Sequence, residues 1–225
     1  MTKGNFSMRL SFLFGLAFTT GLALTGCASD ITQPEQYSGF LDDYSQLQPT
    51  TSASGVPVMR WVSPDYRNDG YTSVYVEKPV FYPTPTPSEQ VSQEALNQVA
   101  TYLHSAMKRE LAQRMTVVET PNTDTLVLRS AITAVTAKTE GLKPYEVIPI
   151  ALVIAATSTA VGTRDRNTDI YVELEALDGR TSQPMVRVVR KGHGLDLENS
   201  DSQLSLADLQ PALDVWAKDA SAFKP

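Results

Sequence analysis

The sequence predicts an α+β protein, a two-layer sandwich in which a mostly antiparallel sheet carries two amphipathic helices on one face. Three observations lead to this fold class. Apolar side chains recur at helical spacing over about 88–114, and again over about 210–223. Between these stretches, residues 168–177 and 184–191 alternate apolar and polar side chains on either side of a turn, which is typical of an antiparallel hairpin. Strands and helices in this order favour segregated layers.

Three extended stretches precede the first helix. Residues 56–62 are predicted to be an edge strand, because Pro57 removes a backbone donor from the hydrogen-bond ladder. Residues 72–82 are rich in β-branched and aromatic side chains, which favours a strand. Proline and threonine alternate over 83–87, where we expect a polyproline II connector.

The first helix is the most clearly marked element. Ser88 is its expected N-cap, because it directly follows Pro87 and precedes an acidic residue, Glu89, in the first turn. Apolar residues at i, i+3, i+4 and i+7 form a stripe wide enough to cover a sheet. This stripe consists of Val91, Ala95, Leu96, Val99, Leu103, Met107 and Leu111.

Two strands are predicted after this helix, over 115–120 and 124–138, joined at Pro121 and Asn122. The alternation in the second strand predicts that one of its faces is apolar. The residues expected on that face are Leu126, Leu128, Ile132 and Ala134.

The hairpin follows, with Asp178 and Gly179 marking its turn. Its first strand alternates strictly, so we expect one buried face and one face in contact with water. The predicted buried residues are Ile170, Val172 and Leu174, and the predicted exposed ones are Tyr171, Glu173 and Glu175.

The final element is the helix over about 210–223. Pro211 suits the first helical position, where its missing N–H costs nothing, and Gln210 precedes it. Its apolar stripe consists of Leu213, Trp216, Ala217, Ala220 and Phe223.

The first 26 residues have the form of a secretory signal. Lys3 and Arg9 form a positive start, and an uncharged stretch with an apolar centre follows over 10–29. Met8 followed by Arg9 would by itself open a compact signal, so translation starting at Met8 would give the same product.

The signal ends in a short box that resembles that of bacterial lipoproteins. Its residues are Leu24, Thr25, Gly26 and Cys27, an aliphatic residue, two small residues and the only cysteine of the chain. The resemblance implies cleavage before Cys27 and a thioether from its sulfur to diacylglycerol, with acyl chains such as palmitate. Two plainer interpretations are a buried apolar thiol and a membrane span, since about 20 uncharged residues just reach the required length.

These features divide the chain into a cleaved signal peptide, residues 1–26, a lipidated flexible tether, residues 27–37, and a single globular domain, residues 38–225. Two or three acyl chains anchor a protein stably. The resemblance implies attachment to the periplasmic leaflet of the outer membrane in a Gram-negative envelope, because Ala28 and Ser29, without an aspartate, follow the cysteine. A tether of about ten residues reaches only about 17 Å, which keeps the domain close to the membrane.

An apolar segment near the middle of the chain, residues 147–161, invites a functional interpretation. Its residues from Ile150 to Val161 carry no charge, and the stretch is too short to cross a bilayer as a helix. The plain interpretation is a buried helix or loop that crosses the sheet. The alternatives are an interaction surface in an oligomer and a mobile loop that gates a ligand.

Charge and composition exclude several classes of partner and site. The net charge is −6, and it becomes −8 when Lys3 and Arg9 leave with the signal, which argues against a nucleic-acid partner. A single cysteine allows no intrachain disulfide, and two histidines with it cannot supply a Cys/His zinc site. No metal or other cofactor is predicted.

The sequence also lacks the usual catalytic motifs: no nucleophile elbow, phosphate-binding loop, dinucleotide fingerprint or zinc-protease motif is present. The weak candidates are His193 in a glycine-flanked turn with Asp196 as its nearest acid, His104 on the first helix, a cation site at Asp42 and Asp43, and the pair Glu173 and Glu175. Each is better explained as a turn, a helix-flank or a solvated residue, so no catalytic residue is predicted and we do not expect an enzyme.

Three further stretches of the mature chain are distinctive: residues 38–47 with the pattern SGFL-x-DYS-x-L, YVEKPVFY at 75–82 and LDVWAKDAS at 213–221. Together with the box that ends at Cys27, they resemble a bacterial lipoprotein family, domain of unknown function 3313. No catalytic residues carry over from this family. The order of elements is also similar to lipoproteins built like the curli-secretion channel subunit, the penicillin-binding-protein activator or the TolB amino-terminal domain, which is analogy of fold alone.

The sequence therefore predicts a lipid-anchored, non-enzymatic envelope lipoprotein that acts through protein contacts in the periplasm. The membrane, through the lipid, and an envelope protein are the expected partners. The alternatives are a subunit of an oligomeric secretion or channel assembly that uses residues 147–161, and a periplasmic hydrolase or small-molecule binder.

Overall fold

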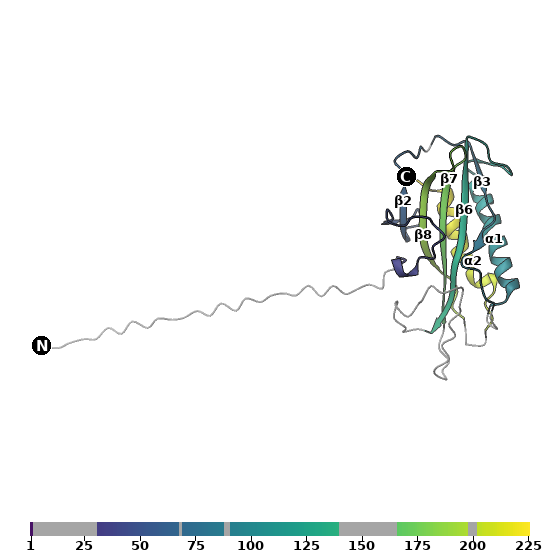
Figure 1. Cartoon of the computed structure of the whole chain (residues 1–225). Helices are drawn as coiled ribbons and strands as arrows, with labels where there is room; N and C mark the ends of the chain where they lie inside the picture. Colours follow the sequence, from purple (N-terminus) through teal and green to yellow (C-terminus); the bar gives the residue numbers. More distant parts are fainter. Residues whose placement is uncertain (2–30, 68, 88–90, 140–165, 198–201) are drawn as a thin grey trace.

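The computed structural model describes Met1 and residues 31–67, 69–87, 91–139, 166–197 and 202–225. One mixed sheet forms the framework, with the strand order β1-β2-β8-β7-β6-β3-β5 and with β4 beside β6 (Figure 1). The strands are β1 (Gln48–Thr51), β2 (Pro57–Val62), β3 (Ser73–Val76), β4 (Val80–Phe81), β5 (Thr116–Val117), β6 (Thr125–Thr139), β7 (Arg166–Asp178) and β8 (Pro184–His193).

The predicted hairpin is the centre of this sheet. β7 and β8 pair antiparallel, with Leu174 opposite Val188, and the turn that joins them begins directly after Asp178. β6 pairs antiparallel with β7 along nearly its whole length. β3 and β4 both pair parallel with β6, so the predicted strand over 72–82 is divided into two short strands. β5 pairs parallel with the other side of β3.

Two helices cover one face of the sheet, and their ends differ from the predicted ones. α1 (Gln93–Leu111) begins after Ser92, whose side chain accepts a hydrogen bond from Ala95 N, so the expected cap at Ser88 is wrong. α2 (Leu206–Ser221) begins after Ser205, four residues before the predicted start. Pro211 is therefore inside α2 and not at its first position.

A capping box explains the earlier start of α2. The Ser205 side chain faces the Asp208 backbone, and the Asp208 carboxylate accepts from Ser205 N at 2.8 Å. This reciprocal pair satisfies backbone donors that would otherwise be unpaired. The stabilisation from this capping box exceeds the cost of the single backbone hydrogen bond that Pro211 cannot donate.

The main core lies between the helices and the sheet, which confirms the α+β fold with both helices on one face. Leu96 of α1 and Leu209 and Leu213 of α2 are almost completely buried against Ile132 and Ile170 of the sheet. Burying a side chain of this size contributes roughly 1.5–3 kcal/mol. The two predicted apolar stripes thus hold the layers together.

Two predictions about individual strands are wrong for identifiable reasons. β2 is not an edge strand, because it lies between β1 and β8, and Pro57 is tolerated at its first position opposite Thr51. In β6 the register shifts between Ile132 and Ala134. This bulge places Val135, and not Ala134, in the main core with Ile132.

The opposite face of β7 is buried, whereas the sequence predicted that it is in contact with water. Tyr171, Glu173 and Glu175 of β7 are all buried. A second, smaller apolar cluster of Leu41, Leu47 and Val189 covers this face. The chain segment that provides the cover is residues 31–47, named here the amino-terminal strap.

Candidate functional site

Several predicted functional residues lie outside the described residues. Cys27 and its box, Leu24, Thr25 and Gly26, are among them, and so is the apolar segment 147–161. The described chain resumes at Ile31, only four positions after Cys27. The site nearest to the predicted anchor is consequently the contact between the amino-terminal strap and the sheet.

The start of the strap is part of the fold, although the sequence assigns residues 27–37 to a tether. Thr32 is buried, and residues Pro34–Gln36 form a short 3-10 helix. Gln36 Nε2 donates a hydrogen bond to the hydroxyl of Tyr171 on β7 at 3.2 Å. Tyr37 stacks on Tyr44 with ring centroids 4.7 Å apart. The strap therefore contacts β7 from its first described turn.

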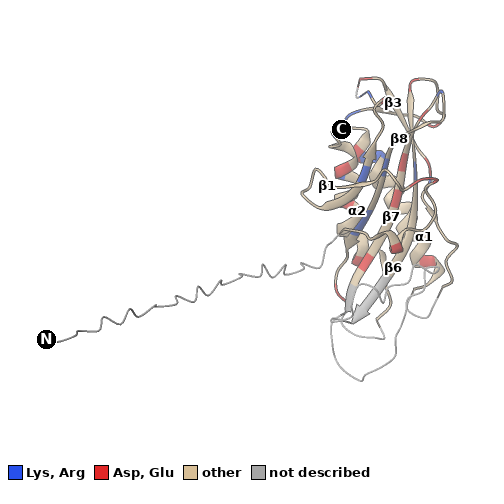
Figure 2. Cartoon of the chain, turned by 60° about the vertical axis from the view of Figure 1, so that its left-hand side comes forward, with Lys and Arg blue, Asp and Glu red and all other residues tan. Residues whose placement is uncertain are grey.

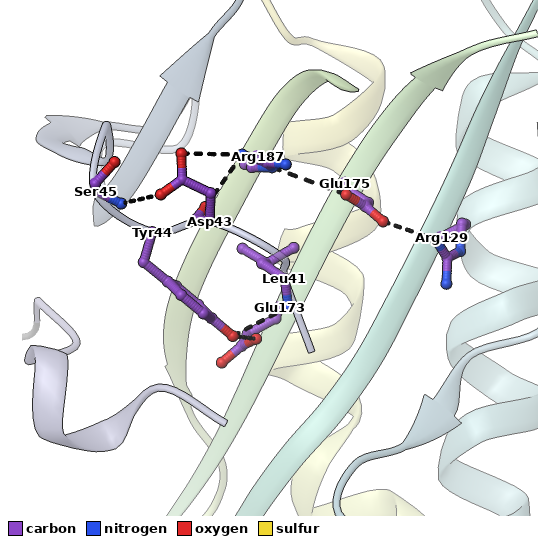
Figure 3. A network of polar contacts seen from close by, with 8 residues as sticks. All are labelled: Leu41, Asp43, Tyr44, Ser45, Arg129, Glu173, Glu175 and Arg187. Carbon is purple, nitrogen blue, oxygen red and sulfur yellow. Dashed lines mark hydrogen bonds and ion pairs between the residues drawn. The ribbon is translucent and has the colours of Figure 1, made fainter. Parts of the chain in front are cut away.

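Tyr44 and Glu173 form the main attachment of the strap (Figure 3). The Tyr44 hydroxyl donates to Glu173 Oε2 at 2.5 Å, and Ser38 N donates to Glu173 Oε1 at 2.7 Å. The same hydroxyl accepts from Gly39 N and Leu41 N at 2.8 and 3.1 Å. Gly39 has a φ of +89°, a conformation that glycine adopts without the usual side-chain clash.

Burial, reinforced by the hydrogen bond to Glu173, raises the pKa of Tyr44 far above the ordinary value for tyrosine. The phenol is therefore a permanent donor at physiological pH. Glu173 is fully buried, and both of its oxygens receive a hydrogen bond from the strap. A buried carboxylate needs such donors, because burial without them is costly.

A second carboxylate, Glu175, lies between two arginines (Figure 3). Glu175 Oε1 is 2.9 Å from Arg129 Nη1, and Glu175 Oε2 is 3.9 Å from Arg187 Nε. Arg187 Nη1 in turn donates to the Asp43 carbonyl at 3.2 Å and lies 3.7 Å from an Asp43 carboxylate oxygen. Burial raises the pKa of Glu175, and the two arginines oppose that shift.

The geometry of this network explains what it can and cannot do chemically. Glu173 and Glu175 line neither the cavity between the helices and the sheet nor the smaller one beside Trp61 and Asp178. Their oxygens are engaged by the strap and by arginines. A glycosidase pair needs carboxyl groups that reach a bound sugar. The two glutamates instead fasten the strap to the sheet, a role that the alternation in β7 alone could not reveal.

His193 has a partner that the sequence analysis missed. Its Nδ1 is 2.8 Å from Asp169 Oδ1, whereas the acid nearest to it in the sequence is Asp196. Asp169 lies directly opposite His193 in the β7–β8 register, and its other oxygen is 3.0 Å from Lys191 Nζ. Counting residue pairs outward from the hairpin turn would have placed Gly192 opposite Asp169, because the register shifts between Ala176 and Leu177. The sequence alone therefore does not reveal this partner.

The remaining candidates have structural roles. His104 Nε2 is 3.0 Å from the Val76 carbonyl, which agrees with the predicted place on the helix flank. Asp43 accepts from Ser45 N at 2.8 Å, and this hydrogen bond lowers the pKa of its carboxyl. Within the described ranges, no three His, Cys, Asp or Glu side chains are grouped so that they could hold a metal ion.

Comparison with known proteins places the chain in a family. Residues 36–220 match the family described as "Protein of unknown function (DUF3313)". The chain belongs to this family. It is also 45% identical over 202 residues to "Uncharacterized lipoprotein YdcL" of Escherichia coli K12, which covers 90% of this chain and 91% of the relative. The protein of that name in Escherichia coli O157:H7 matches equally well.

The DUF3313 chain is thus homologous to a lipoprotein over almost its whole length. Its most specific sequence pattern, residues 38–47, contains Ser38, Asp43 and Tyr44, which contact Glu173 and Arg187. The structure therefore gives this part of the family pattern a physical role.

Solved structures resemble the DUF3313 chain only distantly. The PelC dodecamer from Paraburkholderia phytofirmans is 9% identical, covers 72% of this chain and 96% of its own, and gives a TM-score of 0.37. A minor lipoprotein from Acinetobacter baumannii is 12% identical, with coverage of 68% and 91% and a TM-score of 0.38. Neither helix of the described part combines the length and apolarity needed to cross a membrane.

Proposed function

We propose that this protein is a lipoprotein anchored through Cys27 in the periplasmic leaflet of the outer membrane, and that it acts by binding another envelope protein and not as an enzyme. The observation that carries the proposal is the amino-terminal strap. Its first described residue, Ile31, follows Cys27 by four positions, and the strap is hydrogen-bonded to β7 from Gln36 onward. A lipid on Cys27 would therefore hold the domain directly at the membrane surface.

The homology to a named lipoprotein over 90% of the chain supports the anchor. The engagement of Glu173, Glu175 and Asp169 by neighbouring side chains and the strap supports a non-enzymatic role, since these acids are already paired. The predicted net charge of the mature chain is negative, which argues against binding to anionic lipid headgroups by charge.

The anchor is tested by replacing Cys27 with alanine. We expect Cys27→Ala to abolish labelling with palmitate and to leave an unprocessed precursor, whereas Ser29→Ala is labelled and cleaved normally. Fractionation of the two membranes should place the labelled protein in the outer one. Labelling of the Cys27→Ala variant would contradict the proposal, and labelled protein in the inner membrane would contradict its location.

The proposed contact at the membrane surface is tested by moving the domain away from it. An insertion of about 30 glycine and serine residues between Asp30 and Ile31 raises the r.m.s. reach of the tether to roughly 30 Å. We expect cross-links to a membrane-proximal partner to be lost. The matched control is an extension of equal length and composition after Pro225, which leaves the distance from the anchor unchanged. A protein that never cross-links, in either form, contradicts a role through protein contacts.

A further inference from the structure

A cavity of about 620 Å³ lies between the helices and the sheet, in the half of the sheet where β6 begins and β7 ends. Its inner wall is formed by apolar side chains from both layers. They include Leu103, Met107, Leu126, Leu128, Leu174 and Val188. The volume falls within the range of roughly 300–1,000 Å³ that is usual for small-molecule sites.

The cavity borders the main core, because several buried core residues line it. Leu174 and Val188 face each other at the centre of the sheet, on the face that the helices cover, and yet both remain partly accessible. An unfilled space of this kind loses contacts on every wall and lowers stability. Water fills such a space poorly, because apolar walls offer it few hydrogen bonds. An apolar ligand would restore the missing contacts.

The charged residues of the cavity are mostly positive, although the whole chain is acidic. Arg60, Arg114, Arg190 and Lys224 line it, against one acid, Asp219. Arg190 is buried and pairs with Asp219 at 2.9 Å. Its Nε, however, has no hydrogen-bond partner among the described residues.

The positive side chains near solvent mark the mouth of the cavity. Arg114 and Lys224 are exposed, and Arg60 is half-buried with its guanidinium 5.4 Å from the Phe223 ring centroid. Arg114 donates to the Ser221 and Phe223 carbonyls at 3.0 and 2.6 Å, which holds the end of α2 beside this mouth. Figure 2 shows basic segments in blue on strands close to the carboxyl terminus.

We propose that this cavity binds a single-chain amphiphile with an anionic head group, of the fatty-acid class. The chain lies against Leu174 and Val188, and the head group lies at the mouth beside Arg60 and Lys224. The positive mouth disfavours a cationic amphiphile, and the volume disfavours the two chains of a membrane phospholipid. This site goes beyond the proposed protein contacts and does not depend on them.

The test uses the mature chain from Cys27 to Pro225 with Cys27→Ser, so that it can be purified and stripped of lipid without detergent. Calorimetric titration with dodecanoate below its micellar concentration should show saturable 1:1 binding. Dodecyltrimethylammonium, which has the same chain and the opposite charge, should bind at least tenfold more weakly. Equal binding of the two probes, or no saturable binding of dodecanoate, would overturn the proposal.

Variants locate the ligand. The double variant Arg60→Gln/Lys224→Gln should weaken dodecanoate binding about tenfold, because two favourable charges are lost. The matched control Arg67→Gln/Lys78→Gln removes the same charge from exposed residues outside the cavity and should bind as the unaltered chain does.

Filling the cavity distinguishes this site from others. Leu174→Phe should weaken binding at least tenfold, and Ser130→Leu, which adds a larger volume at the paired position on β6, serves if Leu174→Phe fails to fold. Circular dichroism confirms folding in each case. Undiminished binding in a folded variant of either kind shows that the ligand binds elsewhere. Phosphatidylglycerol vesicles competing as well as dodecanoate would show that a two-chain lipid is the ligand and would also overturn the proposal.

Discussion

Glu173 shows at the scale of one residue how the strap and the sheet depend on each other. The carboxylate is fully buried, and its two closest donors, Tyr44 and Ser38 N, both come from the strap. Without the strap this acid would be buried with too few donors or would have to be exposed to water. The strap in turn is ordered around the Tyr44 hydroxyl, which also accepts from two strap amides, Gly39 N and Leu41 N.

The change Tyr44→Phe tests this interdependence. It keeps the ring that stacks on Tyr37 but removes the donor to Glu173 and the acceptor for two amides. We expect the free energy of unfolding in urea to fall by about 1–3 kcal/mol. Tyr82→Phe removes an exposed hydroxyl that forms no hydrogen bond with the described residues. This change should alter the free energy of unfolding by less than about 0.5 kcal/mol. Equal effects of the two changes would contradict the role of Tyr44.

Arg190 and Asp219 form a buried pair on the opposite, helix-covered face. Burial raises the pKa of Asp219, but hydrogen bonds from Ser54 and Arg190 outweigh burial and hold the pKa below its ordinary value. The carboxylate therefore stabilises the fold at any pH above its unfolded pKa of about 3.9. That contribution is lost as the pH falls through the lower, folded pKa.

The change Asp219→Asn should destabilise the protein by about 3–5 kcal/mol at pH 7, because Arg190 remains buried without its counter-charge. The difference from the unaltered chain should stay constant from pH 7 to about pH 5 and narrow below about pH 4. Urea unfolding at a series of pH values measures it. Asp65→Asn, at an exposed acid, is the control. A difference that does not narrow in acid would show that the Asp219 charge is not responsible.

At the scale of the elements, the spacing of apolar residues predicted the features that depend on a single segment of the chain. The two helices, the hairpin and the face of the sheet that carries Ile170 and Val172 follow from spacing in the sequence. The prediction that one face of β7 is in contact with water was wrong. Glu173 and Glu175 alternate with apolar residues in the same way whether water or another chain segment covers them. Their cover comes from residues about 130 positions earlier in the chain, which no local pattern can reveal.

The ends of the helices were also predicted incorrectly, and a change at Ser92 tests the reason for the error in α1. Ser88 precedes the apolar stripe, whereas Ser92 follows its first residue, Val91. The geometry selects Ser92, whose Oγ is 3.1 Å from Ala95 N. Ser92→Ala should cost about 1 kcal/mol in the free energy of unfolding, the usual value for a lost N-cap. Ser88→Ala, at the position that the sequence favoured, should cost less than about 0.5 kcal/mol. A larger loss of stability in Ser88→Ala than in Ser92→Ala would support the cap that the sequence predicted.

At the scale of the whole molecule, the sheet is covered on both faces, by helices on one and by the strap on the other. The helix-covered face contains the large apolar core and the cavity, whereas the strap-covered face contains the paired carboxylates. The strap also connects this second face to the predicted anchor at Cys27. The proposed membrane attachment and the stability of the fold would therefore depend on one segment.

This arrangement predicts where the folded domain begins. A chain that starts at Ser38, the boundary that the sequence predicts, lacks the Gln36 hydrogen bond to Tyr171 and the stacking of Tyr37 on Tyr44. Each contact contributes roughly 0.5–1.5 kcal/mol, so the chain should be about 1–3 kcal/mol less stable than one that starts at Ile31. Urea unfolding of the two purified chains measures the difference.

The matched control is the non-lipidated chain that starts at Ala28, which should be as stable as the chain from Ile31 because both keep the described strap. Loss of residues 31–37 should also increase proteolysis near Leu41, since the rest of the strap is then held at fewer points. Equal stability of the chains from Ser38 and Ile31 would mean that residues 31–37 add nothing to the fold. The anchor would then act through a longer tether, and the domain would not be confined to the membrane surface.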